Sequence, residues 1–125
     1  MANDKTFHGR RVLVVEDDMM IAMMVEDMLI DLGCQVIGPA RDMSEAFAFA
    51  RDAKALDLAL LDINLGSEMV FPVADMLRAR GIRLIFCSGY GETALRASDS
   101  GCAVLRKPYR LHDLAAALAD ALTGG

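Results

Sequence analysis

The sequence of 125 residues lacks tryptophan and has only three prolines and three cysteines. Cys34, Cys87 and Cys102 are widely spaced and form no CxxC pair, which argues against a disulfide framework and against a zinc site. Free cysteine has a strong tendency to be buried, so we expect three buried, reduced thiols.

The sequence also lacks the features of membrane, secreted and nucleic-acid-binding proteins. No apolar run approaches the length of a membrane span, and residues 1–7 show no signal-peptide pattern, so we expect a cytoplasmic protein without a membrane partner. Acidic residues outnumber basic ones by 18 to 13, and the resulting net charge of -5 argues against a nucleic acid as direct partner. The same balance suits a domain that attracts a cation.

Hydrophobic residues make up 54% of the chain, enough for the core of one domain. Five short runs are apolar rather than alternating, which is typical of strands buried on both faces of a parallel sheet. These runs cover residues 11–15, 35–38, 56–61, 83–87 and 103–105. Helical patterns follow them at about residues 18–32, 44–53, 71–80, 92–98 and 111–122.

This alternation predicts the α/β class, as a doubly wound, flavodoxin-like (βα)5 parallel sheet with strand order 2-1-3-4-5. The domain is expected to span residues 10–122, after a polar N-terminal extension of residues 1–9. Asp17 or Asp18 would cap the first helix, and Ser44 the second. The inward stripe of the first helix would consist of Ile21, Met24, Val25, Met28, Leu29 and Leu32.

Polar side chains follow four of the predicted strands at the same end. They are Glu16 and Asp17 after the first strand, Asp62 after the third, Ser88 after the fourth and Lys107 after the fifth. The carboxyl ends of the strands line the functional crevice of such a sheet, and the first and third strands meet at its switch point. We therefore expect these side chains to converge.

Three carboxylates in one place repel one another, so protons or a cation must offset their charge. Mg²⁺, or Mn²⁺, prefers oxygen ligands. We expect Asp17 and Asp62 to be direct ligands, Glu16 to bind through water, and the backbone carbonyl of Asn64 to supply a further oxygen. The simpler interpretation, in which the acids after the first strand only cap a helix, leaves Asp62 unexplained.

Asp62 would then be a carboxylate nucleophile beside a metal. An incoming phosphoryl group would be stabilised by the metal, by Lys107 and by a hydrogen bond from the Ser88 hydroxyl. Over about residues 10 to 122 the sequence resembles the response-regulator receiver domain, on the strength of Glu16-Asp17, Leu61-Asp62-Ile63-Asn64, Ser88 and Lys107-Pro108 at the strand ends.

The resemblance implies a stand-alone receiver of a two-component phosphorelay, not an enzyme that acts on external substrates. It implies that a sensor histidine kinase or a histidine phosphotransfer protein phosphorylates Asp62, and that the modified protein switches its contacts with a downstream target protein. Glu16 and Asp17 would serve the metal, while Ser88 and Lys107 would sense the phosphoryl group.

The sequence departs from the family's pattern at two places. Receivers commonly carry an aromatic switch residue three positions before the lysine, where this chain has Val104, and the loop after Asp62 lacks the usual proline. The segment Phe86-Cys-Ser-Gly-Tyr-Gly91 is similar to the Phe-Ala-Thr-Gly loop of a bacterial single-domain receiver subfamily. We therefore expect Ser88 to move toward the phosphoryl group while the switch loop Gly89-Tyr90-Gly91 rearranges, a backbone change that glycines make easy.

Five of the nine methionines lie in the first predicted helix. Met19, Met20 and Met23, with Ile30, face away from its inward stripe and form an adaptable apolar surface. Either the last helix covers part of this surface or a partner contacts it. Because phosphodonors dock at this helix in receivers, we favour docking, with Met19, Met20, Met23 and Pro108 as contact residues.

Three alternatives stay open at this point. A Mg²⁺-dependent phosphatase of the haloacid-dehalogenase type also uses a strand-end aspartate, but it needs a second acid where this chain has Asn64. A flavin or nucleotide carrier needs a phosphate-binding loop after the first strand, where this chain has carboxylates. A pseudo-receiver that only binds proteins would not need the full set of acids, hydroxyl and lysine.

Overall fold

The computed structural model describes residues 7–89 and 95–123. Within these residues the chain forms, in order, β1 (Arg11–Val15), α1 (Met19–Asp31), β2 (Gln35–Ala40), α2 (Met43–Asp52), β3 (Leu58–Asp62), β4 (Asn64–Leu65), β5 (Glu68–Met69), α3 (Phe71–Ala79), β6 (Arg83–Ser88), the 3-10 helix η3 (Ala97–Asp99), β7 (Ala103–Arg106) and α4 (Leu111–Thr123).

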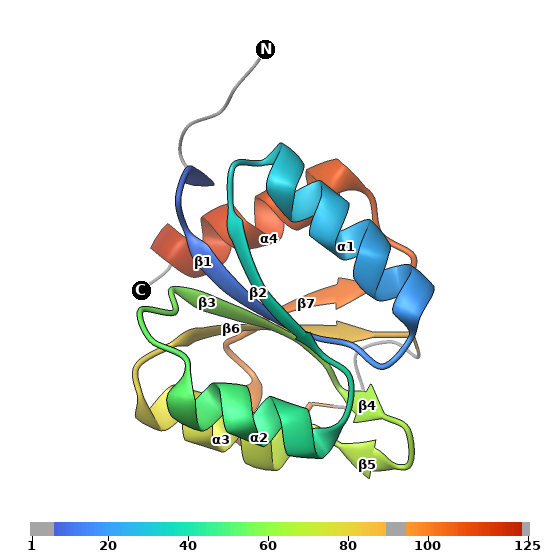
Figure 1. Ribbon diagram of the computed structural model, residues 1–125, viewed down its shortest axis with the longest axis vertical. Helices are drawn as coiled ribbons and strands as arrows, with labels where there is room; N and C mark the ends of the chain where they lie inside the picture. The colour runs from blue at the N-terminus through green and yellow to red at the C-terminus, as the bar shows by residue number, and fades with distance from the viewer. Residues whose placement is uncertain (1–6, 90–94, 124–125) are drawn as a thin grey trace.

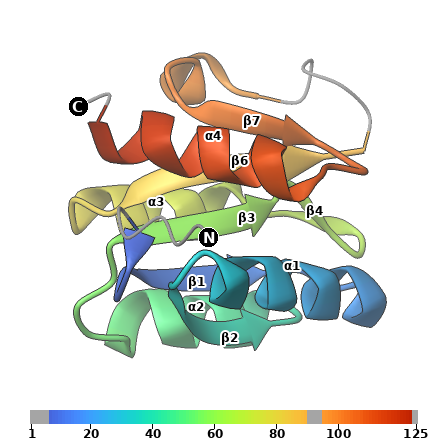
Figure 2. The same ribbon diagram turned by 90° about the horizontal axis from the view of Figure 1, so that it is seen from above.

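Five of the strands form a parallel sheet in the order β2-β1-β3-β6-β7, which confirms the predicted α/β class. Figure 1 shows α1 and α4 on one face of this sheet and α2 and α3 on the other, and Figure 2 shows the same layers from above. Strands β4 and β5 form a separate antiparallel hairpin that was not predicted. The element numbering therefore departs from 2-1-3-4-5, although the five strands of the main sheet, counted by themselves, follow that order.

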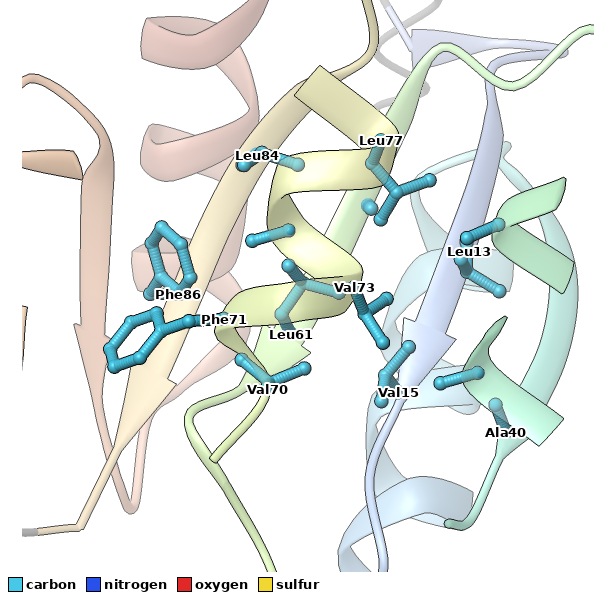
Figure 3. Close-up of a cluster of buried hydrophobic side chains, with 14 of the residues drawn as sticks. Leu13, Val15, Ala40, Leu61, Val70, Phe71, Val73, Leu77, Leu84 and Phe86 are labelled. Carbon is cyan, nitrogen blue, oxygen red and sulfur yellow. The ribbon is translucent and has the colours of Figure 1, made fainter. Parts of the chain in front are cut away.

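Strand β3 lies in the middle of the sheet, and all five of its residues are buried. Apolar side chains of β1, β3 and β6 fall into two clusters, one on the side of α2 and α3 and one on the side of α1 and α4. Figure 3 shows the first cluster, where Leu61 and Phe86 of the sheet lie with Val73 and Leu77 of α3. The buried strands hold their carboxyl ends at one edge, where the polar residues follow.

Aspartate side chains cap the first two helices. Asp18 accepts hydrogen bonds from two backbone N–H groups in the first turn of α1, which confirms one of the two predicted caps. In α2 the cap is Asp42, which accepts a hydrogen bond of 2.8 Å from the N–H of Glu45. The prediction of Ser44 as this cap was wrong, because the helix already begins at Met43.

Three other parts of the chain differ from expectation. Met24 is 47% exposed and not part of the core, because the fully buried residues of α1 are Ala22, Val25 and Leu29. Phe7 is buried in the cluster on the side of α1 and α4, so the polar extension predicted for residues 1–9 contains one side chain that belongs to the core. The helix expected over residues 92–98 falls partly on residues 90–94, which lie outside the described residues, and the described remainder contains only η3.

All three cysteines are free; Cys34 and Cys87 are buried, and Cys102 is half-buried. Burial raises the pKa of Cys34 to about 11 and that of Cys87 to about 12, so both side chains are neutral thiols at physiological pH. In the part of the chain that the structure describes, none of the helices combines the length and the apolar character needed to cross a bilayer.

Candidate functional site

Lys107 joins two of the predicted acids at the carboxyl end of the sheet. Its Nζ atom lies 2.9 Å from Oε1 of Glu16 and 3.0 Å from Oδ2 of Asp62. Glu16 follows β1, Asp62 ends β3 and Lys107 follows β7, so three segments that are far apart in the sequence meet here. Only 3% of Glu16 and 6% of Asp62 is exposed, so both side chains have little contact with solvent.

Burial changes the protonation of this cluster. Burial and the neighbouring charge of Asp62 raise the pKa of Glu16 to about 7, although the hydrogen bond from Lys107 lowers it. Burial also raises the pKa of Asp62, and the contacts with Lys107 offset only part of this effect. Burial lowers the pKa of Lys107, but its hydrogen bonds to both acids outweigh burial and leave that pKa above its usual value. Two acids thus share one lysine, and their negative charge is incompletely offset.

Asp17 adds a third carboxylate from an exposed position after β1. Carboxylate oxygens of Glu16, Asp17 and Asp62 lie within 4.8 Å of one another. A hard divalent cation such as Mg²⁺ takes oxygen ligands of this kind, so the donor set fits the predicted metal.

The β4–β5 hairpin holds Asp17 in this cluster. The backbone N–H of Gly66, between the two short strands, donates a hydrogen bond of 2.9 Å to Oδ2 of Asp17. Gly66 has a φ of +62°, a conformation that glycine adopts without strain. This contact was not predicted, and its only signal in the sequence is a glycine two positions after Asn64.

Ser88 and Asn64 both lie close to Asp62, Ser88 at the end of the neighbouring strand β6 and Asn64 at the start of β4, two residues after Asp62. Ser88 is the buried last residue of β6, and its neighbour Cys87 is the register partner of Asp62. The backbone N–H of Lys107 donates a hydrogen bond of 2.9 Å to the Ser88 carbonyl, which ties the end of β7 to that of β6. The N–H of Asn64 lies 3.4 Å from Oδ1 of Asp62, and the role of its carbonyl as a metal ligand stays a prediction.

The residues predicted to read the phosphorylation are described only in part. Gly89 is exposed, whereas Tyr90 and Gly91 lie outside the described residues. Val104 on β7 is the register partner of Phe86 on β6. An aliphatic side chain therefore occupies the position of the expected aromatic switch.

The methionines predicted for docking are exposed, with exposed fractions of 55% for Met19, 76% for Met20 and 60% for Met23. Ile30 is 58% exposed, so the alternative that the last helix covers part of this surface is wrong for all four residues. Pro108 is exposed as well. Next to these methionines, a cavity of about 260 Å³ is lined by Ile21, Met24, Lys107, Pro108 and Tyr109. Apolar surface thus borders the acidic cluster on the side of α1.

The raised pKa of Glu16 predicts that the metal-free protein loses stability as the pH rises. The folded protein keeps the proton of Glu16 up to about pH 7, whereas the unfolded chain releases it near pH 4.5. The folded state thus binds more protons between these values, so the free energy of unfolding falls across this window, by at most about 3 kcal/mol, and levels off above it. Urea unfolding at pH 5, 6, 7 and 8 in the presence of a chelator measures the slope of the free energy of unfolding against pH.

Glu16→Gln is the control for this prediction, because the amide cannot titrate and should remove the part of the slope that comes from Glu16; the part that remains comes from Asp62, whose pKa burial also raises. Lys107 does not contribute in this window, since its raised pKa keeps it charged in both states. Parallel curves for the wild-type protein and Glu16→Gln would contradict the assignment of the slope to Glu16.

Comparison with known proteins gives the family to which this chain belongs. Residues 12–119 match the family model of the response regulator receiver domain. The chain therefore belongs to the response regulator receiver domain family.

Two curated relatives are similar over most of this chain. Phyllosphere-induced regulator PhyR of Methylorubrum extorquens is 35% identical over 114 residues, which make up 89% of this chain and 43% of PhyR. Transcriptional regulatory protein PdtaR of Mycobacterium tuberculosis is 31% identical over 113 residues, which make up 87% of this chain and 55% of PdtaR. The chain thus spans about half the length of these relatives.

Solved structures of a third protein, SdrG, match nearly end to end. The solution structure of SdrG from Sphingomonas melonis Fr1 has 36% sequence identity and a TM-score of 0.81, and the match covers 92% of this chain and 98% of SdrG. The BeF3-activated conformation of SdrG, from Pseudomonas melonis Fr1, has 37% identity and a TM-score of 0.77, with coverages of 90% and 96%.

Proposed function

We propose that this chain is a stand-alone, cytoplasmic receiver that accepts a phosphoryl group on Asp62 from a sensor histidine kinase or a histidine phosphotransfer protein. The phosphorylated form then changes its contacts with a target protein and does not act on external substrates. The observation that carries this proposal is the contact of Lys107 with both Glu16 and Asp62 at the carboxyl edge of the sheet.

The arrangement of these side chains supports direct transfer to Asp62. Its carboxylate attacks the phosphorus atom, a P–O bond forms, and the bond from phosphorus to the donor's imidazole nitrogen breaks with its electron pair left on nitrogen. The ammonium of Lys107, 3.0 Å from Oδ2 of Asp62, is close enough to pair with oxygens of the arriving group. The Ser88 hydroxyl, at the end of the adjacent strand, donates a hydrogen bond to the same group.

The acidic cluster supports a metal in this reaction. Glu16, Asp17 and Asp62, with the carbonyl of Asn64, would hold Mg²⁺ or Mn²⁺. When bound, the ion supplies positive charge that offsets the charge on the phosphoryl oxygens. The raised pKa values of Glu16 and Asp62 support this assignment, because they mean that the charge of these acids is incompletely offset by the protein alone.

Intact mass spectrometry after incubation with a small acyl phosphate and Mg²⁺ tests the proposal. The protein is expected to gain the mass of one phosphoryl group, and chelation of the metal should prevent the gain. Because SdrG has been solved in a BeF3-activated conformation, beryllofluoride is a suitable second probe of Asp62. A protein that neither gains this mass nor binds beryllofluoride would contradict the proposal.

We also propose that the exposed methionines of α1 contact the phosphodonor protein. Charged substitutions there, Met20→Glu and Met23→Glu, are expected to slow transfer from a phosphorylated histidine phosphotransfer protein about tenfold or more, because they place a charge in an apolar interface. The rate with a small acyl phosphate should stay unchanged, since that donor needs no docking surface. Intact mass over time with each donor measures both rates.

The control for the docking surface is Ile30→Glu. Ile30 is 58% exposed, like the methionines, but lies at the other end of α1, away from the acidic cluster. This variant should behave as the wild-type protein with both donors. Equal slowing of Met20→Glu with the protein donor and with the acyl phosphate would refute docking at this surface.

A further inference from the structure

Four charged side chains tie the described end of the connection between β6 and β7, around η3, to α3. Asp99 of η3 is completely buried and forms ion pairs with Arg78 of α3 and with Arg96, whose Nε atom lies 2.7 Å from Oδ2 of Asp99. Arg96 also reaches α3 directly, because its two Nη atoms lie 2.8 and 3.1 Å from the carboxylate of Asp75. Arg96 is thus the central residue of this contact.

Arg96 also lies on an aromatic ring that belongs to the core. Its Cζ atom is 4.5 Å from the centre of the Phe71 ring, a distance typical of a cation–π contact. The centres of the Phe71 and Phe86 rings are 6.0 Å apart, and Figure 3 shows these two side chains next to each other. Phe86 lies on β6 two residues before Ser88, and Phe71 is the first residue of α3.

The positions of these residues along the chain connect both halves of the proposed phosphoryl site. Phe71 begins the helix that follows Asp62 after the β4–β5 hairpin, and Arg96 lies in the connection that follows Ser88. On the other side of β6, the register partner of Phe86 is Val104, which has no ring to contribute. The aromatic contact at this end of β6 is therefore made with α3 and Arg96.

We propose that Arg96 is a latch that holds the connection after β6 on α3 in the unphosphorylated protein and is released when Asp62 is phosphorylated. This inference rests on the proposed function. Movement of Ser88 toward the phosphoryl group shifts the end of β6 and with it Phe86, whose ring lies next to that of Phe71, so Phe71 and Asp75 lose their contacts with Arg96. The latch provides a response to phosphorylation that does not need an aromatic residue at position 104.

The strengths of the contacts fit such a release. The pair with Asp75 is largely exposed, since 57% of the Asp75 side chain is accessible to solvent, and exposed ion pairs are weak. The contact with buried Asp99 is different, because a buried carboxylate without a partner is strongly unfavourable. Arg78 also pairs with Asp99, so the buried carboxylate keeps a cationic partner when Arg96 leaves Phe71 and Asp75.

Two mild substitutions weaken the latch and leave both arginine partners of Asp99 in place. Asp75→Asn removes the exposed partner of Arg96, and Phe71→Leu removes the ring but keeps an apolar side chain. Because a latch opposes activation, both variants should bind beryllofluoride with Mg²⁺ roughly two- to fivefold more tightly than the wild-type protein. The NMR signal of the Ala97 amide, next to Arg96, should shift when the wild-type protein binds beryllofluoride. In Asp75→Asn without beryllofluoride, this signal should lie between its positions in the free and the bound wild-type protein.

Asp52→Asn is the matched control, because Asp52 is an exposed aspartate that also holds an arginine, Arg51, through two hydrogen bonds of 3.0 Å. It lies at the end of α2, away from the latch, and should leave beryllofluoride affinity unchanged. Wild-type affinity in both latch variants would overturn the latch. An Ala97 signal that stays in place while those of Asp62 and Ser88 move would overturn it too and leave the proposed function intact, whereas no response at Asp62 would refute both.

Discussion

The Asp62→Asn variant is expected to gain no phosphoryl group under conditions that modify the wild-type protein completely. Asparagine has nearly the size of aspartate, and its side-chain oxygen can still accept the 3.0 Å hydrogen bond from Lys107. Its amide, however, lacks the negative charge that makes the carboxylate a nucleophile. Intact mass over a time course with a small acyl phosphate and Mg²⁺ measures the result.

Asp57→Asn is the matched control for this loss. Asp57 is a half-buried aspartate just before the other end of β3, where it accepts a 2.8 Å hydrogen bond from the N–H of Arg11. This variant should be phosphorylated at the wild-type rate, because Asp57 lies at the amino end of the strand. A phosphoryl adduct that persists in Asp62→Asn would place the acceptor on another residue.

Asp62→Asn is also expected to leave the metal-free protein at least as stable as the wild type at pH 8. Burial raises the pKa of Asp62, so the ionised side chain is less favourable in the folded protein than in the unfolded chain. The neutral amide removes this cost. Urea unfolding in a chelator measures it, and a marked loss of stability would mean that the ion pair with Lys107 outweighs burial.

The sheet and its polar edge could be predicted because both depend on strong local patterns. Short apolar runs such as that of β3 have few ways to bury both faces other than a parallel sheet. Once the runs are in a sheet, the position of Asp62 after one run and Lys107 after another fixes their meeting at one edge. The contact between Lys107 and both acids follows from topology, although its distances do not.

The β4–β5 hairpin could not be predicted in the same way. Each strand has only two residues, so neither has a periodicity that a sequence pattern can reveal. Its contribution to the site is the backbone N–H of Gly66, a group that every residue except proline has. Residue types therefore identified Asp17 but not the group that orients it.

The failure at Met24 has a different cause. The 3.6-residue period places Met24 on the inward side of α1, but burial also requires a neighbouring element that covers it. In the structure Met24 instead lines the cavity beside Pro108 and Tyr109 and remains 47% exposed. The periodicity of one helix does not show how far the neighbouring elements extend over it. Residues at the edge of its apolar face, such as Met24, are therefore the hardest to assign to the core from sequence.

Lys107→Gln is the second substitution with a large expected effect, a slowing of Asp62 phosphorylation by about a hundredfold. Lys107 contacts the acceptor carboxylate directly, so its loss removes positive charge from the place where the phosphoryl oxygens arrive. Removing one such stabilising group from a preorganised site typically costs this much in rate. The initial rate of mass gain with a small acyl phosphate at saturating Mg²⁺ measures the effect.

Lys54→Gln is the matched control, because Lys54 is an exposed lysine before the amino end of β3 and should not affect the rate. A Lys107→Gln rate close to the wild type would refute the role of Lys107.

The stabilities of the metal-free variants separate a loss of phosphorylation chemistry from a loss of folding. Without Lys107, the buried carboxylates of Glu16 and Asp62 lose their shared cation, so Lys107→Gln should be less stable than the wild type at pH 8, whereas Asp62→Asn should not. Both variants should therefore lose phosphorylation while their stabilities change in different directions, a combination that general misfolding cannot produce.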